Sequence, residues 1–291
     1  MSASDVVGTP APLVDLLIDR ESHRADIVLR RAERRNALTR TMARDFVRHL
    51  DVVDGDDEVK VVVIRGEGEH LSSGWDPDDA WQQYQDAPGG AVRKHPSQRA
   101  RLIALDDYWW GPDGLYSRLL HCRKVTITQA VGDCFETGLY LTLCSDLVVA
   151  SPDARFACPR WQNVGADGDL SLLIATVGLK RAKEMMYGGR PWSASDAHRY
   201  GLVDKLSIDP ATATAEFAGM CASIMRDGIV TEKYAVFASL AKMGVTHSFA
   251  AATVVSASLS NIHFQPDEYN FLKDARDNGT DAALARSRSH S

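Results

Sequence analysis

Apolar positions in the N-terminal part of the chain follow first a strand pattern and then a helix pattern. Two apolar-rich runs, residues 13–18 and 25–29, are separated by a polar stretch, which predicts a β-hairpin. Between residues 38 and 50 an apolar side chain recurs every four positions, which predicts a helix with one buried face that ends near Gly55. The short apolar run 59–64 then predicts a buried strand.

The same order of elements returns in the middle of the chain. Residues 124–131 have the pattern of a strand, 135–144 that of a helix and 147–150 that of another buried strand. Strand, glycine turn, helix and strand in alternation are typical of an α/β fold built from repeated crossover units. We therefore expect an α/β core over residues 1–206.

The remainder of the chain is helical in pattern and is expected to form one structural unit with the core. The predicted helices are 170–187 with a break at Gly178, 193–200, 211–225 and 232–243. Residues 249–262 are apolar on nearly every face, so we expect them to pack against a second subunit as well as their own core. The region 207–291 is thus a predicted oligomerisation region, and its Arg- and Ser-rich tail, 285–291, is expected to fray.

A long polar and aromatic insertion, residues 77–123, interrupts the core pattern. The Pro-Gly-Gly sequence at 88–90 marks a mobile turn, and the Tyr-Trp-Trp sequence at 108–110 closes a predicted helix. An insertion of this kind could act as a lid over a site in the core.

Composition restricts the class of protein. Of the 291 residues, 45% are hydrophobic and 25% are charged, which is typical of folded globular proteins. No run approaches the roughly 18 apolar residues of a membrane span, and the polar N-terminus lacks a signal-peptide stretch, so we expect a cytoplasmic protein without a membrane partner. A net charge of −6 gives no general attraction to nucleic acid.

Cysteines and arginines narrow the candidate sites further. The five cysteines are odd in number, lack C-x-x-C spacing and lie mostly in apolar runs, so we expect reduced core thiols and no metal site. Four arginines within residues 30–35 form a local basic cluster before a helix whose N-terminus also favours anions. This cluster is the candidate site for a polyanionic ligand.

An ordered set of motifs resembles the enoyl-CoA hydratase/isomerase (crotonase) superfamily. The motifs are R-x-x-R-R-N-A-L at 31–38, S-G-W-D at 73–76, G-x-x-x-E-T-G at 132–138, C-S-D at 144–146, Phe156, and G-L-V at 201–203, with a weaker match at 271–273. The resemblance implies a spiral of ββα units followed by a helical trimerisation region. It also implies a homotrimer or a dimer of trimers, with no permanently bound cofactor and a coenzyme A thioester as substrate.

The same resemblance implies which residues form the site. The backbone N–H groups of Trp75 and Thr137 would form an oxyanion hole for the thioester oxygen, which gains negative charge during the reaction. Arg34 and Arg35 would lie near the coenzyme's phosphates, although a solvated arginine face is the plainer interpretation. The full set implied to bind coenzyme A is Arg34, Arg35, Ala37, Ser73, Pro77, Phe271 and Lys273.

Departures from the family pattern affect both loops. Hydratases of the family use two glutamates to activate water and protonate carbon, whereas this chain has Tyr140 and, beside an alignment gap, Arg160 at those positions. The glycine run of the second loop is replaced by Glu136, Thr137 and Gly138, and side chains adopt some glycine conformations only at a cost. Simple hydration by the two-glutamate route is therefore not expected.

The loop 156–169 offers a substitute for the missing glutamates. The spacing from Trp161 to Asp169 resembles that of the 4-chlorobenzoyl-CoA dehalogenase branch, where such an Asp attacks the acyl ring and the Trp supports it. Asp169 is the first candidate and Asp167 the second, acting as base or nucleophile, with Tyr140 as an aid. An N-cap for the next helix is the alternative role of Asp169.

Aromatic residues are candidates for the acyl pocket. Trp81, Trp109 and Trp110, beside Trp75, could line a pocket for a bulky acyl group, although ordinary core packing is the alternative. The histidines His70 and His121 are weaker candidates for catalysis, and surface or cap roles are more common.

Three functions are compatible with these residues. The first is a lyase or isomerase acting on a bulky enoyl-CoA or aryl-acyl-CoA through a thioester enolate. A hydrolase that cleaves a C–C or ring bond through the same oxyanion is the second, and a non-catalytic acyl-CoA-binding paralogue is the third.

Overall fold

A computed structural model describes residues 12–81, 98–258 and 262–290, and the predicted turn at 88–90 lies outside them. Within the described residues the main sheet has the strand order β1-β2-β3-β4-β6-β9. Its strands are β1 (Val14–Asp19), β2 (Arg24–Leu29), β3 (Val61–Gly66), β4 (Val125–Ala130), β6 (Leu147–Ala150) and β9 (Lys205–Leu206). The predicted hairpin is confirmed, because β1 and β2 pair antiparallel, and the other neighbours in the sheet pair parallel.

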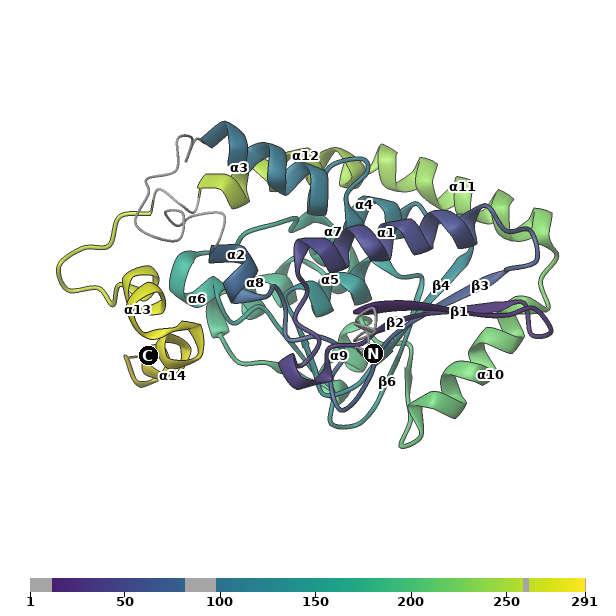
Figure 1. Ribbon diagram of the computed structural model, residues 1–291, viewed down its shortest axis with the longest axis horizontal. Helices are drawn as coiled ribbons and strands as arrows, with labels where there is room; N and C mark the ends of the chain where they lie inside the picture. The colour runs from purple at the N-terminus through teal and green to yellow at the C-terminus, as the bar shows by residue number, and fades with distance from the viewer. Residues whose placement is uncertain (1–11, 82–97, 259–261, 291) are drawn as a thin grey trace, which may run out of the picture.

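Helices cover both faces of this sheet, as Figure 1 shows for α1 above it and α10 below it. In β3, Val62 and Ile64 belong to the large core on the α1 side, whereas Val61 and Val63 belong to a second cluster with α10 (Pro210–Ala222). Successive strand residues point to opposite faces, so the continuous apolar run of β3 is what a strand covered on both sides requires. The predicted buried strand is confirmed.

The helix α1 (Arg40–Asp54) confirms the predicted four-residue periodicity. Met42, Phe46 and Leu50 on its inner face are at most 1% exposed. The side chain of Thr39 caps the helix by accepting the N–H of Met42 at 3.2 Å. The helix therefore begins shortly after the arginine-rich segment 30–35.

A second, three-stranded sheet holds the candidate site and was not predicted. It consists of β5 (Asp133–Phe135), β7 (Arg155–Ala157) and β8 (Trp192–Ser193) in the order β5-β7-β8. The helix predicted from residue 135 instead begins as α5 (Thr137–Cys144), directly after β5. Strands this short carry no periodicity of their own, and their partners lie far away along the chain.

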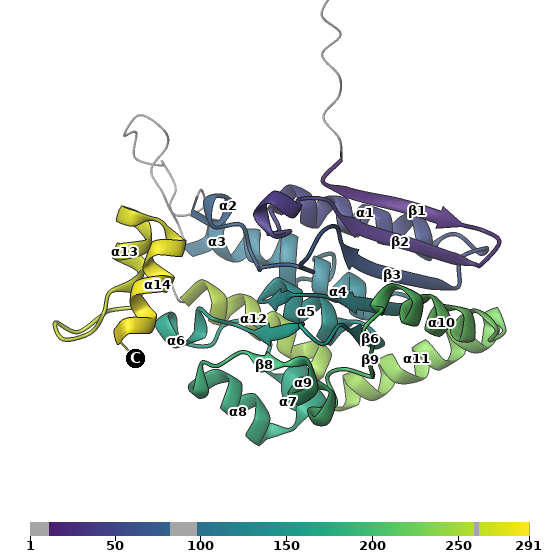
Figure 2. The same ribbon diagram turned by 90° about the horizontal axis from the view of Figure 1, so that it is seen from below.

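The C-terminal region is helical, as predicted. Its helices are α7 (Ser171–Val177), α8 (Leu179–Gly188), α9 (Ala194–Tyr200), α10, α11 (Arg226–Lys242), α12 (Val245–Ser258), α13 (Phe271–Asn278) and α14 (Thr280–His290). Gly178 separates α7 from α8 with a φ of +81°, which confirms the predicted break. Figures 1 and 2 place α13 and α14 at one end of the molecule, opposite the turn of the β1–β2 hairpin.

Residues 285–290 of the tail, which were expected to fray, continue α14, and Ser291 lies outside the described residues. Arg286 of this helix donates from Nε to Asp274 of α13 at 2.6 Å, and Tyr269 donates to the Ala283 carbonyl at 3.0 Å. These contacts connect α14 to α13 and to the segment before it.

The described parts of the insertion are helical. They comprise α2 (Pro77–Trp81), α3 (Gln98–Leu105), the π-helical turn Asp106–Trp110 and α4 (Leu115–Leu120). The prediction that the aromatic run closes a helix is confirmed, since the π-helical turn continues α3 and ends at Trp110. None of the helices in the described ranges is long and apolar enough to cross a membrane.

Candidate active site

The turn at 72–76 lies between the segment before α1 and the strand β5. On one side, Leu38 donates its N–H to the Gly74 carbonyl and accepts the Asp76 N–H, both at 2.8 Å. On the other side, the Ser72 carbonyl accepts the N–H of Phe135 at 2.9 Å. The bridge to Leu38 thus uses the residues on either side of Trp75, and the Trp75 N–H remains for another acceptor.

Two glycines allow the two loops to touch. A Cβ added to Gly138 would lie 2.7 Å from the Ser72 carbonyl oxygen. Gly74 has a φ of +111°, and a Cβ there would lie 2.7 Å from the Oε2 atom of Glu136. Both contacts are too close for any side chain. The first loop therefore lies directly against the N-terminus of α5.

Thr137, the predicted second oxyanion donor, is the first residue of α5 and is fully buried. An N–H in the first turn of a helix has no acceptor inside that helix, and the helix dipole favours negative charge there. Side chains connect the two donor residues: Trp75 Nε1 donates to the Tyr116 hydroxyl at 3.3 Å, which donates to Thr137 Oγ1 at 3.2 Å. The structure thus brings Trp75 and Thr137 together.

The backbone cost of replacing glycine falls on Glu136. Its φ of +48° and ψ of −104° are unusual for a residue with a side chain. Conformations of this kind cost about 1–3 kcal/mol and tend to occur at functional sites. Thr137 itself adopts helical geometry. The strained residue of this loop is therefore Glu136, one position before Thr137.

Glu136 is a site residue that sequence reasoning missed. Its carboxylate accepts Arg160 Nε at 2.6 Å, and its Oε2 atom lies against Gly74, the residue before Trp75. Burial raises the pKa of Glu136, and the Arg160 guanidinium opposes that rise. The sequence carried a signal for this pair: Glu136 stands where the family has a glycine, and Arg160 stands where the family has a glutamate.

Arg160 connects Glu136 to the loop that follows β7. Its Nη2 lies 3.6 Å from Asp167 Oδ2, and its guanidinium lies 4.7 Å from the ring centroid of Trp75. Trp161 Nε1 donates to Asp167 Oδ1 at 2.8 Å. The expectation that Trp161 supports Asp169 is therefore wrong, because its indole binds the other carboxylate of the loop.

Asp169 is 1% exposed and has the contacts of a helix cap. Its carboxylate accepts the Leu172 N–H and the Ser171 hydroxyl, each at 2.8 Å, and also the hydroxyl of Ser248 from α12. Tyr140 donates its hydroxyl to the Asp169 carbonyl at 2.9 Å. Burial raises the pKa of Tyr140 well above its usual value, so its hydroxyl stays a donor.

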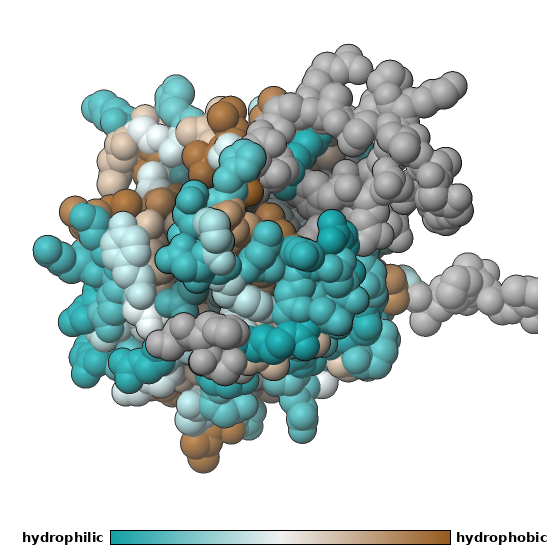
Figure 3. Space-filling view, turned by 90° about the vertical axis from the view of Figure 1, so that its left-hand side faces the viewer, coloured by the Kyte–Doolittle hydropathy of each residue, from teal (hydrophilic) through white to brown (hydrophobic). Residues whose placement is uncertain are grey.

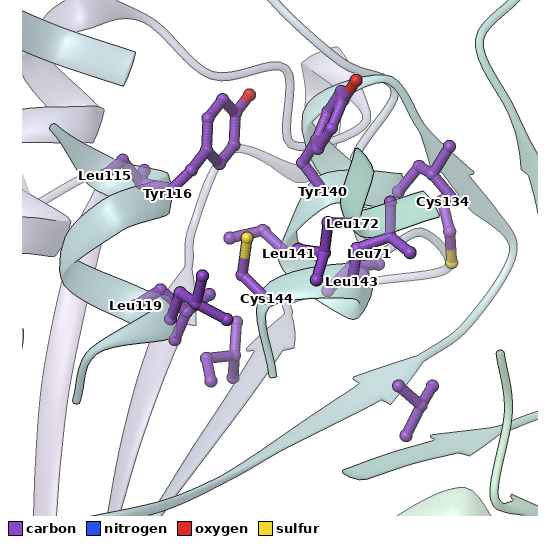
Figure 4. Close-up of a cluster of buried hydrophobic side chains, with 14 of the residues drawn as sticks. Leu71, Leu115, Tyr116, Leu119, Cys134, Tyr140, Leu141, Leu143, Cys144 and Leu172 are labelled. Carbon is purple, nitrogen blue, oxygen red and sulfur yellow. The ribbon is translucent and has the colours of Figure 1, made fainter. Parts of the chain in front are cut away.

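Aromatic rings form a wall beside the two donors. Trp109 stacks on Trp75 with centroids 5.4 Å apart, and Trp110 lies 4.5 Å from Tyr116 and 4.8 Å from Tyr140. Figure 4 shows Tyr116 of α4 and Tyr140 of α5 side by side with their hydroxyls on the same side. Trp109 and Trp110 are buried, and the side chain of Trp81 lies outside the described part of the chain.

The two predicted phosphate-binding arginines lie near the first loop. Arg34 Nη2 lies 2.6 Å from Asp78 and 3.6 Å from Asp76, and Arg35 Nη1 lies 3.3 Å from Asp133. About half of each side chain is exposed. Both guanidinium groups therefore already have carboxylate partners, and an anionic ligand would share or displace them.

The other predicted coenzyme A residues fall into two groups. Ser73 donates its N–H to the Arg35 carbonyl at 2.9 Å, and the Ala37 carbonyl accepts Arg31 Nη1 at 3.0 Å, so both lie beside the arginine segment; Pro77 begins α2. Phe271 is 2% exposed and packs with Val164, while Lys273 is exposed on α13. The end of the molecule seen in Figure 3 is largely hydrophilic, with hydrophobic patches above.

The two candidate histidines have structural contacts. His70 Nδ1 accepts the N–H of Asp133 at 2.9 Å, and His121 Nδ1 lies 2.8 Å from the Ser117 carbonyl. Among the described residues, no group of three His, Cys, Asp or Glu side chains could hold a metal ion.

Comparisons with known proteins identify the family of the chain. The family model for enoyl-CoA hydratase/isomerase matches residues 19–265. A putative enoyl-CoA hydratase of Mycobacterium tuberculosis is 30% identical, covering 76% of this chain and 72% of the relative. A 4-chlorobenzoyl coenzyme A dehalogenase of Arthrobacter is 28% identical over 62% of each protein.

A solved structure extends the similarity to nearly the whole chain. An enoyl-CoA hydratase/isomerase from Xanthobacter autotrophicus superposes with a TM-score of 0.76 at 26% identity, covering 96% of this chain and 98% of that one. The fold is therefore the crotonase-like spiral with a C-terminal helical region, as expected. The chain belongs to the enoyl-CoA hydratase/isomerase family.

Proposed function

We propose that this protein is an acyl-CoA-processing lyase or isomerase that acts through a thioester enolate. One observation carries the proposal: the turn that holds Trp75 lies against the N-terminal turn of α5, where Thr137 is the first residue and would supply a second donor. In the reaction, the thioester oxygen accepts both N–H groups as its negative charge grows. Each such donor contributes roughly 10²–10³ in rate.

The surroundings of the donors support a bulky or aromatic acyl group. Trp75, Trp109 and Tyr116 present rings beside the oxyanion position, with hydroxyl and indole groups tied to Thr137. Aromatic walls stabilise aromatic ligands through offset or edge contacts. Arg34 and Arg35, half exposed beside the first loop, are the proposed partners of the coenzyme's phosphates.

The charged groups of the site replace the family's glutamates. Asp167 lies within the Arg160 cluster, and Asp169 caps α7 with its carboxylate buried against Ser248. We retain Asp169 as the proposed proton mover, with Asp167 as the second candidate. Tyr140 supports both, because it holds the carbonyls of this loop.

A pair of variants tests the oxyanion donor. Trp75→Pro and Trp75→Ala both remove the indole, but only proline removes the backbone N–H. The bridge to Leu38 does not use that N–H, so the loop can tolerate its loss. We expect kcat of the proline variant to be about 10²-fold below that of the alanine variant on an acyl-CoA that the wild type converts.

The substrate is sought first with a panel of enoyl-, aryl- and alicyclic acyl-CoAs, measuring both binding and product. Equal kcat in the two Trp75 variants would refute the proposed donor. Failure of the wild type to bind any acyl-CoA would refute the function as a whole. Tight binding without product anywhere would instead favour a non-catalytic acyl-CoA-binding protein.

A further inference from the structure

The carboxylate of Glu136 lies beside the position that the proposed function assigns to the thioester oxygen, because its Oε2 atom lies against Gly74, the residue before Trp75. Resting on the proposed function, we propose that Glu136 is a catalytic residue, the base that forms the enolate by removing the α-proton of the bound acyl thioester and the acid that can return it. Asp169 remains the proposed proton mover for the step of turnover that follows the enolate.

Position is the first argument. A thioester oxygen that binds the Trp75 N–H lies beside the Glu136 carboxylate, whose Oε2 atom lies against Gly74 and whose Oε1 atom is held by Arg160 Nε at 2.6 Å. The α-carbon is bonded directly to the carbonyl carbon. A carboxylate beside the oxygen is therefore within reach of the α-proton, as a general base must be.

Charge is the second argument. One guanidinium, that of Arg160, serves two carboxylates, because Asp167 Oδ2 lies 3.6 Å from Nη2. Asp167 is further held by Trp161 Nε1 at 2.8 Å, whereas Glu136 lies against the first loop at Gly74. Burial raises the pKa of Glu136, and the nearby charge of Asp167 adds to that rise, against the effect of Arg160.

Conformation is the third argument. The backbone of Glu136 is held at a φ of +48°, which glycine would adopt without strain. The side chain is only 12% exposed and touches both loops. The fold thus holds a carboxylate in a strained position at the donors, as is typical of functional sites.

The proposed step balances without any co-reactant. Glu136 takes the α-proton, and the C–H electron pair forms the C=C bond of the enolate. The carbonyl π pair moves to oxygen, where the N–H groups of Trp75 and Thr137 stabilise it. Protonated Glu136 then returns the proton to carbon, while Arg160 stabilises the carboxylate in its charged form.

Exchange of the α-proton in D₂O measures this step apart from overall turnover. The probes are phenylacetyl-CoA and butyryl-CoA, followed by NMR with wild type, Glu136→Gln and Glu184→Gln. Glu184 is a partly exposed partner of Arg181 on α8 and serves as the matched control. We expect Glu136→Gln to lose about 10²-fold or more in exchange rate, with dissociation constants for both probes within about threefold of wild type.

A second variant guards against misfolding of the first. Glu136→Gly relieves the strained φ, and we expect it to be folded, inactive in exchange and partly rescued by added acetate. Exchange that is unchanged or faster in the Gln or Gly variant would overturn the inference and leave Glu136 as the ion-pair partner of Arg160 only. Wild type that binds the probes without exchanging them would overturn it as well. Absence of probe binding would instead count against the proposed function.

Discussion

Asp169 carries two separable roles, a cap of α7 and a proposed proton mover. Asn caps a helix N-terminus about as well as Asp, because its side-chain oxygen accepts the same backbone N–H. The substitution Asp169→Asn therefore keeps the bond to the Leu172 N–H while removing the negative charge. The two roles consequently predict different outcomes for one variant.

We expect Asp169→Asn to abolish turnover while leaving coenzyme A binding intact. Its free energy of unfolding should stay within about 1 kcal/mol of wild type, since the cap is retained. Steady-state kinetics, acyl-CoA binding and urea unfolding check these three quantities, and Asp167→Asn is measured in parallel. Retained turnover in Asp169→Asn would show that Asp169 only caps α7. Asp167 would then be the proposed catalytic carboxylate of the loop.

Single residues show what the sequence could and could not predict about the site. The closeness of Trp75 and Thr137 was predictable, because the place of each residue follows from the position of its loop in an ordered set of motifs. Their role as donors remains a proposal. Glu136 was not, because its meaning depends on Arg160, 24 positions later, and on its contact with Gly74. The predicted partner of Trp161 was wrong for a similar reason, since sequence spacing alone does not determine which of two carboxylates an indole N–H reaches.

Elements were predicted best where one periodicity runs through several turns. The helix α1 was predicted from its stripe of buried side chains, and the break between α7 and α8 was predicted from Gly178. The strands β5, β7 and β8 were missed because they are two or three residues long and exist through pairing with one another. These strands hold the second loop, so sequence reasoning was weakest at the element that builds the site.

The short helix α2 follows the turn at 72–76 and is held to it by Asp76. The Asp76 carboxylate accepts the Asp79 N–H at 2.8 Å as a helix cap and Arg31 Nη1 at 2.7 Å. Burial alone would raise the pKa of Asp76, but the Asp79 N–H and Arg31 outweigh it, and the pKa is lowered. The charged carboxylate thus fastens α2 beside Trp75.

This lowered pKa predicts how stability changes with pH. A depressed carboxylate pKa contributes stability above the ordinary Asp pKa of about 3.9, and the contribution is lost as pH falls through the folded-state pKa. We expect Asp76→Asn to be less stable than wild type at pH 7 and the difference to shrink below about pH 4. Urea unfolding at a series of pH values measures it. A difference that does not change with pH would contradict the assigned role of the charge.

At the scale of the whole molecule, the helices α11 and α12 carry several exposed large apolar side chains. Tyr234, Val236, Met243 and Val254 are each at least 50% exposed on these helices or at their junction. Exposed apolar side chains gathered in a patch commonly mark a protein interface. We propose that this surface joins copies of the chain, as expected for a homotrimer or a dimer of trimers.

Light scattering coupled to gel filtration should accordingly give three or six times the chain mass of 31.9 kDa. Val254 is 59% exposed, and a charge there would have to be desolvated in an interface, so Val254→Glu should shift the protein toward smaller species. Lys242→Gln, an exposed polar position on α11, serves as the control and should leave the mass unchanged. A wild-type protein that stays monomeric at tens of micromolar concentration would contradict the interface, and dissociation in both variants would contradict its location at Val254.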